Sequence, residues 1–244
     1  MARKIIPIGL SLGLMVALVA MSMRPTVSAD GPAKPTTEPN AAGEISSTAA
    51  DASGAADAET VQTAIVAGGC FWCIESAFEL VPGVSNVESG YIGGLKRHAD
   101  YNTILKFKKP IAGLPLHTEA VRFQFDPRQI TYEEVLRKFM AIHDPTSLYR
   151  QGPDSGPQYM TAIFYVDNDQ REIAEKVKRE LDASGQYSRP IVTKIKDGTG
   201  KDETSTFYMA EDYHQDYFRK NPDNAYCVIN AAPKMRKMKK MIDK

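Results

Sequence analysis

The sequence predicts an α+β fold: a two-layer α/β sandwich with a mixed sheet and a ferredoxin-like core. Strand-like and helix-like segments alternate through residues 61–244. Several connections between them are short and irregular, which favours this fold over a doubly wound parallel sheet. The length of this part is that of one domain with a full core.

The first twenty-nine residues are predicted to be an export signal and not part of the fold. Arg3 and Lys4 give a basic start, residues 5–20 are mostly apolar, and Val27-Ser-Ala29 is a small-x-small cleavage site. The alternative is an uncleaved membrane anchor, but the apolar run is shorter than the roughly 20 residues that span a bilayer. We therefore expect an exported, periplasmic protein.

Residues 30–60 are predicted to be a disordered linker. Ala, Ser, Thr, Gly and Pro dominate them and no aromatic residue occurs, so they bury too little apolar surface to offset chain entropy. The formal net charge of the whole chain is zero, which gives no argument for a nucleic-acid partner. We expect residues 61–244 to form the catalytic domain, as a monomer.

The domain begins with a strand, a tight turn and a helix. Residues 62–67 are apolar and partly β-branched, which is typical of a buried strand. Gly68 and Gly69 permit a tight turn. From residue 71 apolar side chains recur at helical spacing. Cys70 is therefore predicted at the N-terminus of a helix.

This position predicts a reactive thiol. Free N–H groups at a helix start favour negative charge, so we expect a lowered pKa for Cys70. Cys73 lies one helical turn further on, within bridging range. Three cysteines in an exported chain indicate a reactive thiol rather than a disulfide framework.

The cysteine pair has three other possible roles. A zinc site needs two further ligands, and Cys227 and the four His show no paired spacing. Two buried structural cysteines are possible. A thioredoxin-like pair is the main alternative, but that family has its Trp before the first Cys and usually Gly-Pro inside the pair. Here Phe71 and Trp72 lie inside it.

Alternating apolar and polar residues predict further strands, and Gly and Pro residues predict the loops between them. Strands are predicted at residues 84–91, 119–125, 159–166 and 191–196. Loops are predicted at residues 95–117 and 150–158, and the length of the first suggests a functional role.

Helices follow from capping residues and apolar faces. The capping box Thr131-Tyr-Glu-Glu134 opens one, and residues 169–184 form a second that ends at Gly185. A short helix is predicted at residues 211–220, ended by Asn221-Pro222. We expect the Lys- and Met-rich tail from Lys234 to cover a sheet edge.

The stretch Gly69-Cys-Phe-Trp72 resembles the signature of the A-type peptide methionine sulfoxide reductases. That family usually has Gly at the next position, whereas a subset has Cys, as here at Cys73. Five further stretches resemble the family's motifs in the same order: Gly90-Tyr-Ile-Gly-Gly94, Leu116-His-Thr-Glu119, Gln151 to Tyr159, Phe207 to Gln215 and Asn221 to Cys227. The chain departs from the pattern at residues 106–115 and lacks the Gly that precedes the family's His.

The resemblance implies a set of site residues, and the chemistry explains them. A sulfoxide sulfur becomes electrophilic when its oxygen is protonated, so the site needs a thiolate and an acid. Cys70 would be the thiolate and Glu119 the acid. Tyr101 and Tyr159 would donate hydrogen bonds to the oxygen. Phe71 and Trp72 would hold the S-methyl group, and Asp154 would orient the substrate or the tyrosines.

Each of these residues also has a purely structural reading. Glu119 could be an edge charge, the two tyrosines could be packing residues, and Asp154 could start a turn. His214 is expected to brace its own helix. Cys227 is either an additional redox residue or a small buried hydrophobe.

The expected activity is thiol-dependent reduction of methionine S-sulfoxide, free or in oxidised exported proteins. Cys70 becomes a sulfenic acid, Cys73 converts it to a disulfide, and an external dithiol of the thioredoxin type reduces that disulfide. No bound cofactor or metal is expected. The alternatives are a thiol–disulfide oxidoreductase that uses Cys70 and Cys73, and a catalytically silent peptide-binding module.

Overall fold

A computed structural model describes residues 61–243 of the chain. They belong to the second of the two units into which the chain divides, Asp51–Lys244. The predicted signal peptide and the predicted linker lie outside the described residues. Among residues 61–243, no helix is long and apolar enough to cross a membrane.

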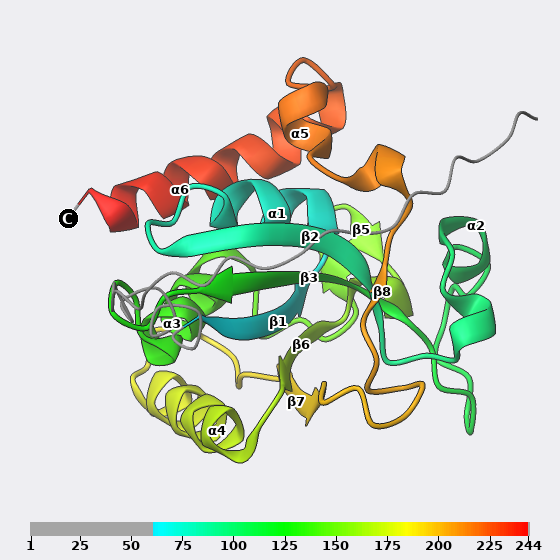
Figure 1. Ribbon diagram of the computed structural model, residues 1–244, viewed down its shortest axis with the longest axis horizontal. Coiled ribbons are helices and arrows are strands. Elements are labelled where there is room, and N and C mark those ends of the chain that lie inside the picture. The colour runs from blue at the N-terminus through cyan, green and yellow to red at the C-terminus, as the bar shows by residue number, and fades with distance from the viewer. Residues whose placement is uncertain (1–60, 244) are drawn as a thin grey trace, which may run out of the picture. The chain divides into compact units, whose positions relative to one another are not determined.

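A six-stranded mixed sheet forms one layer of the domain (Figure 1). Its strands, in spatial order, are β7 (Lys194–Asp197), β6 (Thr161–Tyr165), β1 (Gln62–Gly68), β3 (Thr118–Phe125), β2 (Val84–Ile92) and β8 (Tyr208–Met209). Every neighbouring pair is antiparallel except β6 and β7. The predicted mixed sheet is confirmed.

The helical layer packs on one face of this sheet. It contains α1 (Phe71–Phe78), α3 (Tyr132–Ile142), α4 (Asn168–Ala183) and α6 (Ala232–Ile242). Helix α1 contacts β1, β2 and β3, whereas α6 contacts α1 and α3 (Figure 1). In chain order β1-α1-β2-β3-α3-β6, with spatial order β6-β1-β3-β2, these elements form the predicted ferredoxin-like core.

Apolar side chains fill the space between the two layers. The main core comes from the helices and from the strand residues that face them, among them Val66, Phe123 and Leu136. The opposite face of the sheet carries a smaller cluster around Ile65 and Phe164, which loop side chains cover. The domain is therefore a two-layer sandwich, and loops form the second cover of the sheet.

Three predicted elements are shorter or more broken than expected. The predicted helix at residues 211–220 is a 3₁₀ turn, Asp212–His214, followed by α5 (Tyr217–Lys220), because Asp216 takes a left-handed conformation with φ 56°. Tyr159 lies in the 3₁₀ turn Pro157–Tyr159 that precedes strand β6. The last long strand begins only at residue 194, since the amides of Ile191 and Val192 bond to Asp182 and to the Pro145 carbonyl.

Other elements were not predicted. The long loop at residues 95–117 holds a 3₁₀ turn, Lys96–His98, and helix α2 (Tyr101–Ile104). A second, two-stranded sheet pairs β4 (Arg150–Gln151) with β5 (Asp154–Ser155). A π-helical segment, Cys227–Ala231, leads into α6. The prediction that the tail covers a sheet edge was wrong, because α6 lies on helices α1 and α3.

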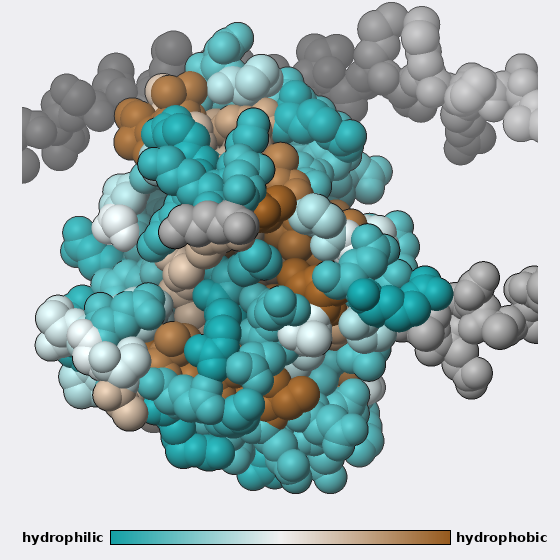
Figure 2. Space-filling model, turned by 90° about the vertical axis from the view of Figure 1, so that its left-hand side faces the viewer, coloured by the Kyte–Doolittle hydropathy of each residue, from teal (hydrophilic) through white to brown (hydrophobic). Residues whose placement is uncertain are grey.

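The outer helices turn their charged faces to solvent. In α4 the buried side chains are Gln170, Ala174, Val177 and Leu181, about one turn apart, and in α6 the buried side chain is Met238. The face of the molecule in Figure 2 is accordingly mostly hydrophilic, with apolar residues visible in narrow strips between charged ones.

Gly69→Ala is expected to destabilise the protein more than Gly113→Ala. Both glycines have positive φ, 89° and 75°, so both variants bear a backbone cost of roughly 1–2 kcal/mol. Only at Gly69 would the new Cβ also lie 2.6 Å from the Cβ of Gln151, whereas nothing lies within 4 Å at Gly113. Urea unfolding at pH 7 gives both free energies, and equal losses would contradict the close approach.

Candidate active site

The turn between β1 and α1 is held by close packing on both sides. A Cβ on Gly68 would lie 2.8 Å from the Phe139 ring of α3, and one on Gly69 would overlap Gln151. Gln151 is itself fixed, since its side-chain amide bonds the backbone N–H and C=O of Asp144 at 3.0 and 2.8 Å. The two glycines thus let the backbone approach α3 and the 150–152 turn closely. Cys70 follows as the N-cap of α1.

The two cysteines of the pair are buried and reduced. Cys70 and Cys73 are 6% and 1% exposed. Burial raises the pKa of the Cys70 thiol well above its usual value, and the neighbouring Cys73 raises it further. The hydrogen bond from Cys70 lowers the pKa of Cys73. In the resting pair Cys73 therefore holds the negative charge more readily than Cys70.

The predicted lowering of the Cys70 pKa by the helix start is wrong for this state. The sulfur makes no capping hydrogen bond to the first turn of α1. The Phe71 amide instead donates to Oε2 of Glu119 at 3.0 Å. The sequence predicted that N–H groups at the helix start would stabilise the Cys70 thiolate, but the Phe71 N–H is bonded to Glu119 of the sheet.

Glu119 is a buried carboxyl beside Cys70. It lies on β3 opposite Tyr91 of β2, and its side chain is 2% exposed. Burial raises its pKa well above the usual value, Cys70 acts in the same direction, and the Phe71 amide opposes them. Burial therefore favours the protonated form of Glu119, and the reading as a solvated edge charge is excluded.

The structure brings four predicted polar residues together around Cys70. Glu119, Tyr101, Tyr159 and Asp154 interact electrostatically with Cys70 and with one another. The tyrosines are half-buried, and burial together with Glu119 raises the pKa of Tyr101 to about 12. The pKa of Tyr159 is raised by the same causes. Both phenols are therefore protonated donors at physiological pH.

Tyr101 reaches the site although the loop around it departs from the family pattern. It is the first residue of α2, and its amide donates to Oε1 of Glu211 at 3.0 Å. The other oxygen of Glu211 accepts from the Tyr91 hydroxyl at 2.7 Å. Glu211 therefore ties α2 to strand β2 and fixes the start of the loop.

Phe71 and Trp72 form an aromatic wall at the start of α1, and both rings are at least partly buried. Phe71 is 1% exposed and packs against Tyr91 and His214, with ring centroids 5.9 and 4.9 Å away. Trp72 is partly buried and stacks on Tyr217 at 3.6 Å. Its indole N–H donates to Nδ1 of His214 at 3.1 Å, so His214 braces Trp72.

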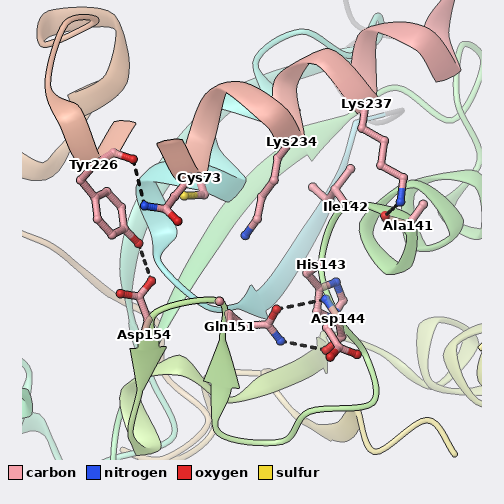
Figure 3. A pocket seen from close by; sticks show the side chains of 12 residues that line it. Cys73, Ala141, Ile142, His143, Asp144, Gln151, Asp154, Tyr226, Lys234 and Lys237 are labelled. Carbon is pink, nitrogen blue, oxygen red and sulfur yellow. Dashed lines mark hydrogen bonds between the residues drawn. The ribbon is translucent and has the colours of Figure 1, made fainter. Parts of the chain in front are cut away.

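Tyr226 is a site residue that the sequence analysis missed. Its hydroxyl donates to Oδ2 of Asp154 (Figure 3) and also lies in hydrogen-bond contact with Cys70, where it lowers the pKa of the thiol. The available signal was its place in the stretch Asn221 to Cys227, directly before a cysteine.

Cys227 is fully buried at the start of the π-helical segment, which packs on α1. Burial raises its pKa, and Cys70 adds to this through its charge. The third thiol therefore lies near the pair without contacting water. Among the described residues, no group of three or more His, Cys, Asp or Glu side chains is placed to hold a metal ion.

Comparisons with known proteins agree with this geometry. A family model described as peptide methionine sulfoxide reductase matches residues 62–244. The peptide methionine sulfoxide reductase MsrA of Thermus thermophilus is 46% identical over 179 residues, which cover 73% of this chain and 94% of that protein. The MsrA of Deinococcus radiodurans is 44% identical over 178 residues, or 73% and 81% of the two chains.

Solved structures give the same result for the fold. Mxr1 from Saccharomyces cerevisiae in reduced form matches with a TM-score of 0.61 and 27% identity, over 71% of this chain and 93% of that one. Methionine sulfoxide reductase A of Corynebacterium diphtheriae matches with a TM-score of 0.55 and 34% identity, over 67% and 76%.

Tyr226→Phe is expected to make Cys70 less reactive at pH 7, because the thiolate loses a hydrogen bond. A hydrogen bond to a charged group contributes about 1.5 kcal/mol, which corresponds to about tenfold in rate. Iodoacetamide labelling followed by peptide mass spectrometry measures the rate at Cys70. Tyr187→Phe is the control, because that hydroxyl bonds the Met140 carbonyl at 2.9 Å. Equal rates in the two variants would contradict the assignment.

Proposed function

The chain belongs to the peptide methionine sulfoxide reductase family, and from that premise we propose that it transfers the oxygen of methionine S-sulfoxide to Cys70 and resolves the product through Cys73. Reduction of methionine sulfoxide is the activity of the family. The stereochemistry, the residue roles and the disulfide are the parts proposed here. One observation carries them: the buried pair of Cys70 and the protonated Glu119, joined through the Phe71 amide.

The first step transfers oxygen to sulfur. The Cys70 thiolate attacks the sulfoxide sulfur while Glu119 gives its proton to the sulfoxide oxygen. The attack forms a bond between the two sulfurs. The hydroxyl then migrates from the methionine sulfur to the Cys70 sulfur while the S–S bond breaks, which leaves a sulfenic acid on Cys70 and releases methionine as the thioether. Tyr101 and Tyr159 donate hydrogen bonds to the oxygen as its negative charge develops.

The thiolate forms within the cysteine pair. In the resting pair Cys73 holds the negative charge more readily, so the reactive thiolate forms when the proton of Cys70 passes to Cys73. The Tyr226 hydroxyl stabilises the charge there. Of the two aromatic rings, the partly buried Trp72 offers an apolar surface for the methyl group, since Phe71 is 1% exposed.

The second step forms a disulfide. The Cys73 thiolate attacks the Cys70 sulfur of the sulfenic acid, and the hydroxyl leaves with one proton as water. An external dithiol of the thioredoxin type then reduces the disulfide by exchange and is itself oxidised to a disulfide. The net reaction converts one sulfoxide and one dithiol into one thioether, one disulfide and one water.

The alternative, a thiol–disulfide oxidoreductase, needs only the two cysteines. It gives no role to a buried carboxyl beside the nucleophile or to two phenols that face it. We therefore favour the sulfoxide as substrate.

We also propose that the protein acts outside the cytoplasm, as a monomer in the periplasm that repairs oxidised exported proteins. Support for export comes from the sequence pattern of residues 1–29.

Glu119→Gln is expected to slow methionine release by about a hundredfold, the usual contribution of a general acid. In the wild type the rate should fall as pH rises through the raised pKa of Glu119, because the acid loses its proton. The variant should lack that decline. Single-turnover release of methionine without dithiol is the measurement.

Glu88→Gln is the matched control for that prediction, because Glu88 lies on the neighbouring strand and pairs with Arg122 at 2.6 Å. A wild-type rate in Glu119→Gln would mean that the carboxyl is only structural.

Cys73→Ser is expected to release one equivalent of methionine and then stop as a sulfenic acid that dimedone traps. Cys227→Ser should keep most of its turnover with dithiothreitol, because Cys73 is the thiol hydrogen-bonded to Cys70. Cys70→Ser should release no methionine. The opposite behaviour of the first two variants would make Cys227 the resolving residue.

A further inference from the structure

A cavity of about 350 Å³ lies beside Cys73, between helix α6, the 141–144 turn and the β4–β5 turn (Figure 3). Its walls include Cys73, Gln151, Asp154, Tyr226, Lys234 and Lys237. Cys70 and Glu119 are not among its lining residues. The cavity therefore lies next to the Cys73 thiol. It is separate from the proposed position of the sulfoxide beside Cys70 and Glu119.

Lys234 points into this cavity and has no partner among residues 61–243. Figure 3 shows its side chain reaching from α6 toward the space beside Cys73. The other cation of the cavity, Lys237, donates to the carbonyl of Ala141. The half-buried ammonium group of Lys234 is thus the cation available to the thiol.

The acidic residues of the cavity are occupied elsewhere. Asp154 accepts from the Tyr226 hydroxyl. Asp144 accepts from Thr146 at 2.9 Å and from Arg189 at 3.1 Å. Neither carboxylate lies in ion-pair contact with Lys234, although the charge of Lys234 lowers the pKa of Asp154.

The position of Lys234 is fixed by packing. It lies in the first turns of α6, and this helix contacts both α1, which carries Cys73, and α3. The helix continues directly from the π-helical segment. A cation at this position is held in place by the helix and not by a mobile loop.

The charged and polar groups that face Cys73 can be compared by their effects. Contacts with Cys70 and Tyr226 lower the pKa of Cys73, whereas burial and Asp154 raise it. His143 is neutral, because burial lowers its pKa to about 3. Lys234 is the positive charge that acts on Cys73, and it lowers the pKa of this thiol. No such effect of Lys234 is found for Cys227.

We propose that Lys234 is a positioning residue for the resolving step: its ammonium group stabilises the Cys73 thiolate that attacks the Cys70 sulfenic acid. This rests on the proposed function. The step forms the S–S bond, breaks the S–O bond of Cys70 and releases water with one added proton. When the dithiol later attacks the disulfide at Cys70, the same charge stabilises Cys73 as the leaving thiolate.

The test follows the resolving step against pH. The reduced full-length protein is mixed with one equivalent of methionine sulfoxide without dithiol, between pH 5.5 and 9. Dimedone then traps the remaining sulfenic acid, and mass spectrometry gives methionine, sulfenic acid and disulfide at each time. Lys234→Met is compared with the wild type, with Lys234→Arg and with Lys237→Met.

In Lys234→Met the midpoint of the rate–pH profile should move up by about one unit, as expected for loss of one nearby opposite charge. At pH values below both midpoints this means about tenfold less thiolate. A more basic thiolate is also about threefold more nucleophilic, so the step should slow by about threefold. Above both midpoints the deficit should vanish or reverse. Lys234→Arg and Lys237→Met should follow the wild type.

The outcomes separate this inference from the proposed function. An unchanged midpoint in Lys234→Met, or a slowing that is equal at every pH, overturns the role of Lys234 while the function stands. Failure of the wild type to release methionine overturns the function itself. A disulfide between Cys70 and Cys227 in the wild type overturns both the resolving role of Cys73 and this inference. Lys234→Gln serves as a second neutral variant if Met disturbs α6.

Discussion

The hydrogen bond from the Phe71 amide to Glu119 is the interaction on which the site depends. It joins the first residue of helix α1 to strand β3, inside the sheet, with an N–O distance of 3.0 Å. The contact is possible because Gly68 and Gly69 bring the helix start close to α3 and to the 150–152 turn. Cys70 lies between the glycines and this hydrogen bond, so its position is set from both sides.

Burial then decides the chemistry. In a low dielectric the charged forms of Cys70 and Glu119 are both disfavoured, and the charge of Cys70 raises the pKa of Glu119 further. The Glu119 carboxyl is therefore held toward its protonated form. The Cys70 thiolate therefore needs compensation, and the contact with the Tyr226 hydroxyl is the one that lowers the pKa of Cys70. Burial thus favours the neutral form of both groups, which suits a proton donor at Glu119 and disfavours a thiolate at Cys70.

The elements around this centre come from distant parts of the chain. Strand β3 brings Glu119, the turn after β5 brings Tyr159, and the segment before α6 brings Tyr226. The aromatic wall is assembled similarly, since Trp72 of α1 stacks on Tyr217 of α5 and is braced by His214. Side chains from the C-terminal third therefore complete a site that begins at the first strand.

The sequence by itself determined the core fold and most of the residues that meet at the candidate site. Period-2 and helical patterns are local, so they placed β1, α1, β3, α3 and α4 within a few residues, and the order of the motifs identified Cys70, Glu119 and the two tyrosines. Only the tertiary structure decided which donor meets which acceptor. The Phe71 amide bonds Glu119 and not the thiol, Asp216 divides a predicted helix, and Lys234 faces Cys73. These outcomes depend on contacts between residues far apart in the chain, and no local pattern records them.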